Sequence, residues 1–211
     1  MTPVKILALQ YIPNAAPALC DQLGIDRHQP SLGLITTDCD DATYIALDAA
    51  TKAADVTVCF GRSFYAGAGN ASTPYAGEVL GILSGATPGA VSSGMEALKN
   101  ALAHLGFSDA DGIPFLAHTV SSCGTFLAQE ANVPIGTALA YLIAPPIESM
   151  VGLDAALKAA DVTLRKLYTP PTETNFGGGL LSGSQSACNA ACQAFADVIR
   201  RIAHTPQEER I

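Results

Sequence analysis

Residues 47–58 read LDAATKAADVTV, and residues 153–164 read LDAALKAADVTL. Ten of these twelve positions are identical, and the offset of 106 is half of the 211-residue chain. Near-identity at a fixed offset is typical of a duplicated structural unit. The sequence therefore predicts two copies of one unit, each carrying a helix that leads into a strand.

The similarity continues beyond this segment. Leu83-Ser84-Gly85 recurs as Leu181-Ser182-Gly183, and each triplet precedes an amphipathic stretch with apolar residues at i, i+4, i+7, i+11 and i+14. This spacing places the apolar side chains on one stripe of a helix. The stripes are Val91, Met95, Leu98, Leu102 and Leu105 in the first copy, and Cys188, Cys192, Phe195, Ile199 and Ile202 in the second.

Each half is predicted to run strand, short helix, strand, helix, strand, loop, strand, helix. In the first half we expect strands near 4–11, 31–37, 55–62 and 77–84, and main helices near 41–54 and 88–105. Four strands with helices on one face indicate an α/β fold, a two-layer sandwich, in each half. The predicted domains are residues 1–106 and 107–211.

Composition limits the partners and the location of the chain. Hydrophobic residues make up 49% and charged residues only 14%, and the net charge is −8. A low content of charged residues is typical of a chain that buries part of its surface against copies of itself. A negative net charge disfavours binding to nucleic acid. The most apolar stretch, residues 133–153, is interrupted by prolines and Glu148, so we expect no membrane span. No secretory signal is apparent, and six scattered cysteines indicate reduced thiols in the cytosol.

Several short motifs carry a family resemblance. They are S-L-G-L-I at 31–35, D-x-D-D-x-T-Y at 38–44, G-R-S-x-Y-A-G-A at 61–68, A-G-E-V-L at 76–80, F-L-A-H at 115–118, A-P-P at 144–146, E-T-N at 173–175 and L-x-G-S-Q-x-A-C at 181–188. Together with the repeat they resemble the L-type shell proteins of ethanolamine-utilisation microcompartments. The resemblance implies two tandem, circularly permuted bacterial microcompartment domains and a homotrimer that imitates a hexamer. It further implies lateral tiling with other shell proteins in the bacterial cytoplasm, and a structural rather than an enzymatic role.

The resemblance also implies a ligand site. In similar proteins a small peripheral pore contacts ethanolamine through the equivalents of Asp40, Asp41, Glu78, Phe107 and Ser182, with threonine more familiar at position 182. Acids between a strand and a helix commonly cap the helix. One acid suffices for a cap, so the remaining carboxylates are predicted to hold a protonated amino alcohol weakly.

The resemblance further implies that two loops rich in small residues meet at the threefold axis and form a gated central pore. The residues singled out are Tyr65, Gly67, Gly69 and Asn70 in one loop, and Asn175, Phe176, Gly177, Gly178 and Gly179 in the other. The alternative is a permanently ordered loop in which glycine only permits tight turns. A phosphate-binding loop is disfavoured because the glycine run lacks a following Gly-Lys-Ser/Thr.

Lys52 and Lys158 occupy matching positions in the two copies. In similar shell domains this lysine lies at the edge of the tile and contacts the neighbouring tile, and the alternative is a solvated lysine.

The spacing of Cys188 and Cys192 favours core packing over a metal clamp, and the four histidines lack metal-ligand spacing. We predict no metal and no cofactor. A cytosolic sensor or enzyme on a duplicated scaffold remains the competing function, although no catalytic constellation is evident.

Overall fold

The computed structural model describes residues 1–64 and 77–207. The chain divides into two compact units. The N-terminal unit comprises Pro3–Gly106 together with Gly124–Leu127, and the C-terminal unit comprises Met1–Thr2, Phe107–Cys123 and Ala128–Ile211. The short segment Gly124–Leu127 thus packs with the first unit although it lies in the second half of the sequence.

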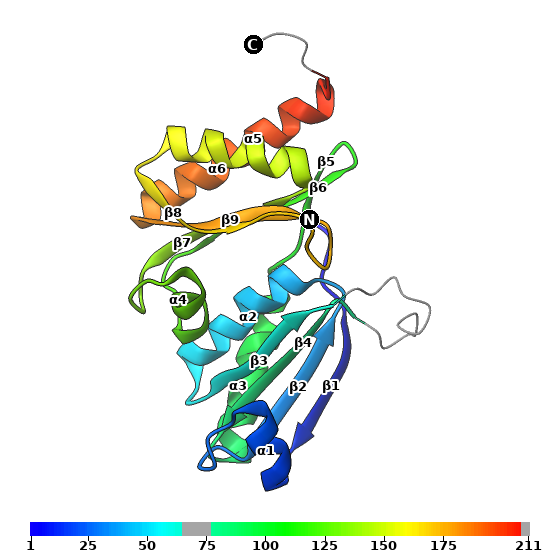
Figure 1. Cartoon of the computed structure of the whole chain (residues 1–211), viewed down its shortest axis with the longest axis vertical. Helices are drawn as coiled ribbons and strands as arrows, with labels where there is room; N and C mark the ends of the chain where they lie inside the picture. Colours follow the sequence, from blue (N-terminus) through cyan, green and yellow to red (C-terminus); the bar gives the residue numbers. More distant parts are fainter. Residues whose placement is uncertain (65–76, 208–211) are drawn as a thin grey trace. The chain divides into compact units, whose positions relative to one another are not determined.

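The N-terminal unit contains one antiparallel sheet with strand order β1-β2-β4-β3 (Figure 1). Its elements are β1 (Ile6–Ile12), α1 (Pro17–Leu23), β2 (Ser31–Thr37), α2 (Asp40–Ala53), β3 (Thr57–Ser63), β4 (Val79–Gly85) and α3 (Pro88–Leu102). Helices α2 and α3 pack together on one face of this sheet. Gly33 lets α3 approach closely, since a Cβ there would lie 2.7 Å from Cγ of Met95.

The C-terminal unit repeats this plan with strand order β5-β6-β7-β9-β8. Its elements are β5 (Ser108–Ala110), β6 (Ile113–Val120), α4 (Thr125–Ala131), β7 (Ala138–Ala144), α5 (Pro146–Ala159), β8 (Val162–Tyr168), β9 (Gly177–Gly183) and α6 (Gln185–His204). Helices α5 and α6 cover one face of the sheet (Figure 1). Phe195 of α6 and Leu153 of α5 belong to the apolar core of this unit.

The duplication extends to an irregularity in the sheets. The β3–β4 ladder shifts register between Val58 and Phe60, and the β8–β9 ladder shifts between Leu164 and Lys166. The residues skipped, Cys59 and Arg165, are separated by the same offset of 106 as the sequence repeat. A bulge bends its strand and is part of the fold rather than a defect. Equivalent positions in the two copies can therefore be compared residue by residue.

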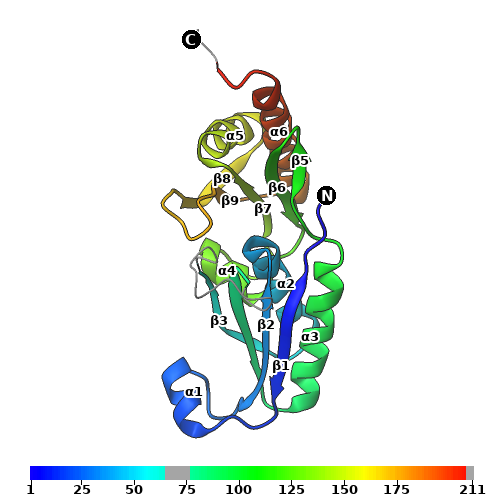
Figure 2. The same ribbon diagram turned by 90° about the vertical axis from the view of Figure 1, so that its right-hand side faces the viewer.

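The predicted α/β fold and the four main strands of each copy are confirmed, and both predicted helical stripes face the cores. All five positions from Val91 to Leu105 are buried, as are Cys188, Cys192, Phe195 and Ile199. Three details differ. Helix α3 ends at Leu102, and β5 is an additional strand. Helix α1 packs against the sheet face opposite α2 and α3, because Cys20 joins a second apolar cluster with Leu32 and Ile82 (Figure 2).

Candidate functional site

An acidic junction, defined by Asp38, Asp40, Asp41 and Glu78, lies where β2 leads into α2 and where β4 begins. Asp40 and Asp41 form the first turn of α2 and are buried, and Glu78 immediately precedes β4. The backbone joins the two segments, because the Glu78 amide donates to the Thr37 carbonyl oxygen at 2.8 Å. Three of the predicted ligand residues are therefore in the same unit, at the same end of the two central strands.

Hydroxyl groups hold the turn into α2 in place. The Cys39 amide donates to Oγ1 of Thr37 at 3.1 Å, and the Thr43 hydroxyl donates to the Cys39 carbonyl at 2.8 Å. The helix cap is Cys39, without a side-chain bond, so no aspartate occupies the capping position. Asp40 nevertheless accepts the Asp41 amide at 2.8 Å, which satisfies one of the unpaired amides of the first turn. This local bond uses one carboxylate oxygen of the junction.

The electrostatics of the junction favour a cation. Burial, followed by the carboxylates of Asp40 and Asp38, raises the pKa of Glu78 to about 7. None of the ion pairs seen in residues 1–64 and 77–207 includes Glu78. Burial also raises the pKa of the Cys39 thiol, so this neighbouring cysteine stays protonated and is a poor nucleophile. A bound ammonium group would relieve the repulsion between the acids.

Phe107 and Ser182, the other two predicted ligand residues, belong to the C-terminal unit. The Phe107 ring packs edge-on against Phe176, with ring centroids 5.4 Å apart. Ser182 is buried in β9, and its hydroxyl oxygen accepts a hydrogen bond from Nε of Arg165 at 2.7 Å. The serine hydroxyl keeps its own hydrogen to donate. That Phe107 and Ser182 share one ligand site with the three carboxylates stays a prediction.

The structure corrects the expected conformation of the second pore loop. Gly177, Gly178 and Gly179 are the first residues of β9, paired with β7 on one side, and Gly178 and Gly179 are also paired with β8 on the other. The glycines are required by close backbone approach, since a Cβ at Gly178 would overlap the Leu142 carbonyl oxygen. The turn between β8 and β9 contains Asn175, at φ 61°, and Phe176. The first loop, with Tyr65, Gly67, Gly69 and Asn70, lies outside the described residues.

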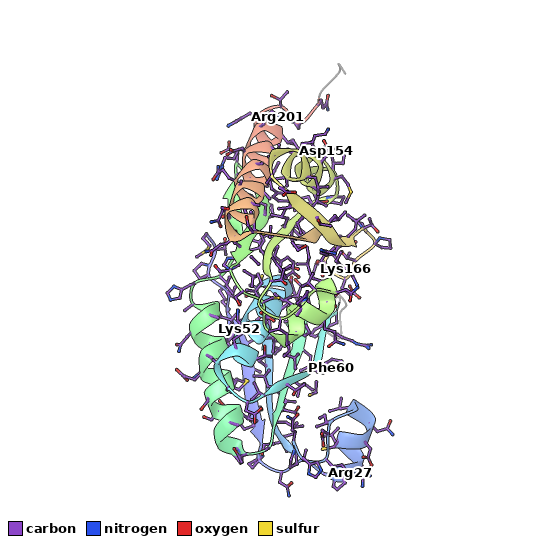
Figure 3. The ribbon with its side chains drawn as sticks, turned by 90° about the vertical axis from the view of Figure 1, so that its left-hand side faces the viewer. Arg27, Lys52, Phe60, Asp154, Lys166 and Arg201 are labelled. Atoms are coloured by element: carbon purple, nitrogen blue, oxygen red, sulfur yellow. The ribbon has the colours of Figure 1, made fainter. Side chains whose placement is uncertain are left out.

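The two repeated lysines differ in their surroundings. Figure 3 labels Lys52 of α2 and Asp154, the partner of the second lysine, on α5. Lys52 lies 3.5 Å from the carboxylate of Asp48, whose side chain is fully buried. Lys158 bonds to Asp154 at 2.6 Å, and both side chains are exposed. Neither arrangement tests the predicted lateral contact, which stays a prediction.

Asp48 is a structural residue whose role the sequence did not reveal. Its two carboxylate oxygens accept the amides of Gly124 at 2.7 Å and Leu127 at 2.9 Å, at the start of α4. Bonds from amides to an ionised carboxylate are among the stronger ones in proteins. The available signal was the identity of Asp48 and Asp154 within the repeat, which helix propensity does not require.

Over residues 1–64 and 77–207, no group of three or more His, Cys, Asp or Glu side chains is arranged to hold a metal ion. Cys188 and Cys192 are buried in the core of the C-terminal unit, which confirms the packing interpretation. No helix among the described residues is both long and apolar enough to cross a membrane.

Comparison with known proteins identifies relatives over nearly the full length. The family model "BMC domain" matches residues 31–111. The chain is 51% identical to the bacterial microcompartment shell protein EutL of Clostridium perfringens over 206 residues, covering 96% of this chain and 95% of that protein. It is 45% identical to the shell protein EutL of Escherichia coli over 206 residues, covering 96% and 94%.

A solved structure agrees with the sequence relatives. The crystal structure of the ethanolamine utilization protein EutL from Leptotrichia buccalis superposes with a TM-score of 0.94 at 51% identity. The superposition covers 98% of this chain and 97% of that one. Both halves of the duplicated chain are thus matched by the same relatives.

Proposed function

The chain belongs to the EutL family of bacterial microcompartment shell proteins, and from that premise we propose how it assembles and what it binds. Its role is that of a structural shell subunit of the ethanolamine microcompartment in bacteria, and not that of an enzyme. Three copies form a trimer that imitates a hexamer, and trimers tile the facet beside other shell proteins. Small molecules cross through a gated central pore and through small peripheral pores.

The ligand proposal depends on one observation, the acidic junction with its half-buried Glu78. Three carboxylates, Asp40, Asp41 and Glu78, suit a small cation better than a neutral or anionic solute. Ethanolamine carries an ammonium group for these acids and a hydroxyl group that Ser182 can bond. We propose that the aromatic ring of Phe107 bounds the site.

Affinity must be weak because the ligand is small. Ethanolamine has four heavy atoms, so its binding free energy cannot exceed about 6 kcal/mol at a ceiling of about 1.5 kcal/mol per atom. Dissociation constants are then tens of micromolar at best, and a millimolar value fits a pore that must also release its cargo. Salt should weaken the binding because it screens charged groups that are partly solvated.

Calorimetric titration of the assembled protein with ethanolamine tests the site. We expect Asp41→Asn to weaken binding at least fivefold, and Asp26→Asn, at an exposed aspartate of the same unit, to leave it unchanged. Propane-1,2-diol, which lacks the ammonium group, should bind more weakly than ethanolamine. Equal ethanolamine affinity in the wild type and in Asp41→Asn would remove the acidic junction from the ligand site.

A further inference from the structure

We infer that the hydroxyl groups of Tyr44 and Ser63 bind the hydroxyl end of the ligand at the acidic junction and make the site selective for amino alcohols over simple amines. The inference rests on the ligand site proposed above and deepens it, because it names the groups that recognise the uncharged half of the ligand. The carboxylates cannot do this alone, since they attract the ammonium group that every small alkylamine shares with ethanolamine.

Tyr44 lies on the same side of α2 as the aspartates of the junction. It follows Asp41 by three residues and Asp40 by four, and residues at these spacings are neighbours on a helix. Side chains of a helix lean toward its N-terminus, so the phenol extends over the turn that carries the acids. Burial, followed by the carboxylates of Asp40 and Asp41, raises the pKa of Tyr44 to about 12. The phenol is therefore close to both acids and keeps its proton at neutral pH.

Ser63 brings a second hydroxyl group to the same place from β3. It is the last residue of that strand and pairs with Val79 of β4, the residue after Glu78. The following amide, that of Phe64, donates to the Glu78 carbonyl oxygen at 2.9 Å. Oη of Tyr44 and Oγ of Ser63 lie 2.5 Å apart. This hydrogen bond thus connects the helix that carries the aspartates to the strand beside Glu78.

The hydroxyl pair keeps the capacity to bind a third group. Two hydroxyl groups carry two protons, and the bond between them uses one. The second proton and the remaining lone pairs match a ligand hydroxyl, which both donates and accepts. An ammonium group has only protons to donate and is positively charged, so it is drawn to the carboxylates instead. The pair and the acids therefore suit the two different ends of an amino alcohol.

The length of the ligand also favours this pair. Only two carbon atoms separate the ammonium and hydroxyl groups of ethanolamine, so the group that binds the hydroxyl must lie close to the acids, as Tyr44 does on α2. Ser182, the other candidate for this role, belongs to the C-terminal unit. Its oxygen already accepts a hydrogen bond from Nε of Arg165, a cation. Ser182 is the competing hydroxyl in the experiment below.

Packing holds the Tyr44 ring in position independently of its hydroxyl group. The ring contacts Phe126, with centroids 5.9 Å apart and planes tilted by 44°. A Cβ at Gly61 would lie 3.6 Å from Cε1 of Tyr44 and 3.2 Å from Cζ of Phe126, so the two rings share this strand surface. Tyr44→Phe removes the hydroxyl group and keeps these ring contacts, which makes it the most specific variant for the test.

Two ligands that differ only at the hydroxyl end test the inference. Propylamine has a methyl group in place of the hydroxyl of ethanolamine, and both are ammonium ions at about pH 7.5. Calorimetric titration of the assembled wild type should show about fivefold tighter binding of ethanolamine than of propylamine, since one hydrogen bond changes affinity by about twofold to tenfold. Tyr44→Phe should weaken ethanolamine binding by about the same factor and leave propylamine binding unchanged. Ser63→Ala should act in the same way.

Tyr11→Phe is the matched control, because Tyr11 is an exposed tyrosine of the same unit outside the junction. It should leave the binding of both amines unchanged. Ser182→Ala should also keep the preference for ethanolamine, and loss of the preference in that variant alone would assign the hydroxyl contact to Ser182 and overturn the inference.

The remaining outcomes separate this inference from the proposed function. Tyr44→Phe and Ser63→Ala proteins that prefer ethanolamine as strongly as the wild type does would overturn the inference and leave the acidic junction as the ligand site. Equal losses for both amines would give Tyr44 a structural role only and would overturn the inference as well. A wild type that binds neither amine would overturn the proposed ligand site itself.

Discussion

At the scale of single residues, Glu78 connects the folded structure to binding. Its carboxyl group is half-buried and faces Asp40 and Asp38, and burial is the main cause of a pKa of about 7. Cys39 and Tyr44 are two further titratable groups beside the aspartates of the junction, and burial raises both of their pKa values, that of Tyr44 to about 12. Only Glu78 among them changes charge near neutral pH.

Ethanolamine binding should therefore strengthen as the pH rises from 6 to 8. An ammonium ligand binds best to ionised Glu78, and a carboxyl of pKa about 7 goes from mostly protonated to mostly ionised over this range, which allows up to about a tenfold gain. The measurement is calorimetry at constant ionic strength in two buffers of different ionisation enthalpy, which also reports proton release. Glu78→Gln should flatten the profile, and a wild-type affinity independent of pH would contradict the role of Glu78.

The acidic junction and Asp48 show which residues the sequence could predict and which it could not. Asp40 and Asp41 were recognisable as acids at a helix start, and Glu78 was added through the family resemblance. The structure places all three where β2 ends and β4 begins. Asp48 was missed because its partners, the amides of Gly124 and Leu127, are backbone groups far along the chain. Every residue except proline has a backbone amide hydrogen, so these donors leave no recognisable motif in the sequence.

At the scale of elements, periodicity predicted the helices well and the glycine run poorly. The spacing of apolar residues predicted α3 and α6, because a stripe of large apolar side chains is visible in the sequence. Gly177–Gly183 begins with three residues that have no side chains, and they were assigned to a loop although they form the start of β9. Glycine in a strand marks close approach of another backbone, here the Leu142 and Lys166 carbonyls.

Gly178→Ala should lower the free energy of unfolding by about 3 kcal/mol, because the residue adopts φ 154° and its new Cβ would overlap the Leu142 carbonyl oxygen. Gly112→Ala is the matched control, with φ 91° but nothing within 4 Å of the new Cβ. Its expected loss is about 1 kcal/mol. Urea unfolding of both variants at the same protein concentration measures the difference, and equal losses would show that strain alone, without overlap, determines the cost.

At the scale of the whole molecule, the two halves share a fold but differ in what they present. Equivalent helices α2 and α5 carry a buried and an exposed aspartate, and equivalent lysines are correspondingly less and more exposed. The repeat in the sequence predicted the shared fold, and it could not predict these differences because they depend on which segment lies against each helix.

Lateral tiling should depend on both lysines. Lys52→Ala combined with Lys158→Ala should leave the trimer intact and abolish extended sheets in negative-stain microscopy, since the predicted contact donates from these side chains to the neighbouring tile. Alanine is preferred to an acid because an acid at position 52 would repel Asp48. Lys99→Ala, which removes an exposed lysine paired with Glu96, is the control. Sheets that persist unchanged in the double variant would assign the tiling to other residues.

The hydrogen bonds of Asp48 to the amides of α4 can form only late in the synthesis of the chain. Gly124 follows Asp48 by 76 residues, and at ~5–20 residues per second a ribosome needs roughly 4 to 15 s to add that stretch. During this interval the carboxylate lacks both amide donors and has Lys52 of its own helix beside it, and the surface of α2 that α4 later covers stays open. The first unit is therefore completed only by Gly124–Leu127, so a nascent chain that stalls before this segment carries an incomplete surface that only further synthesis can cover.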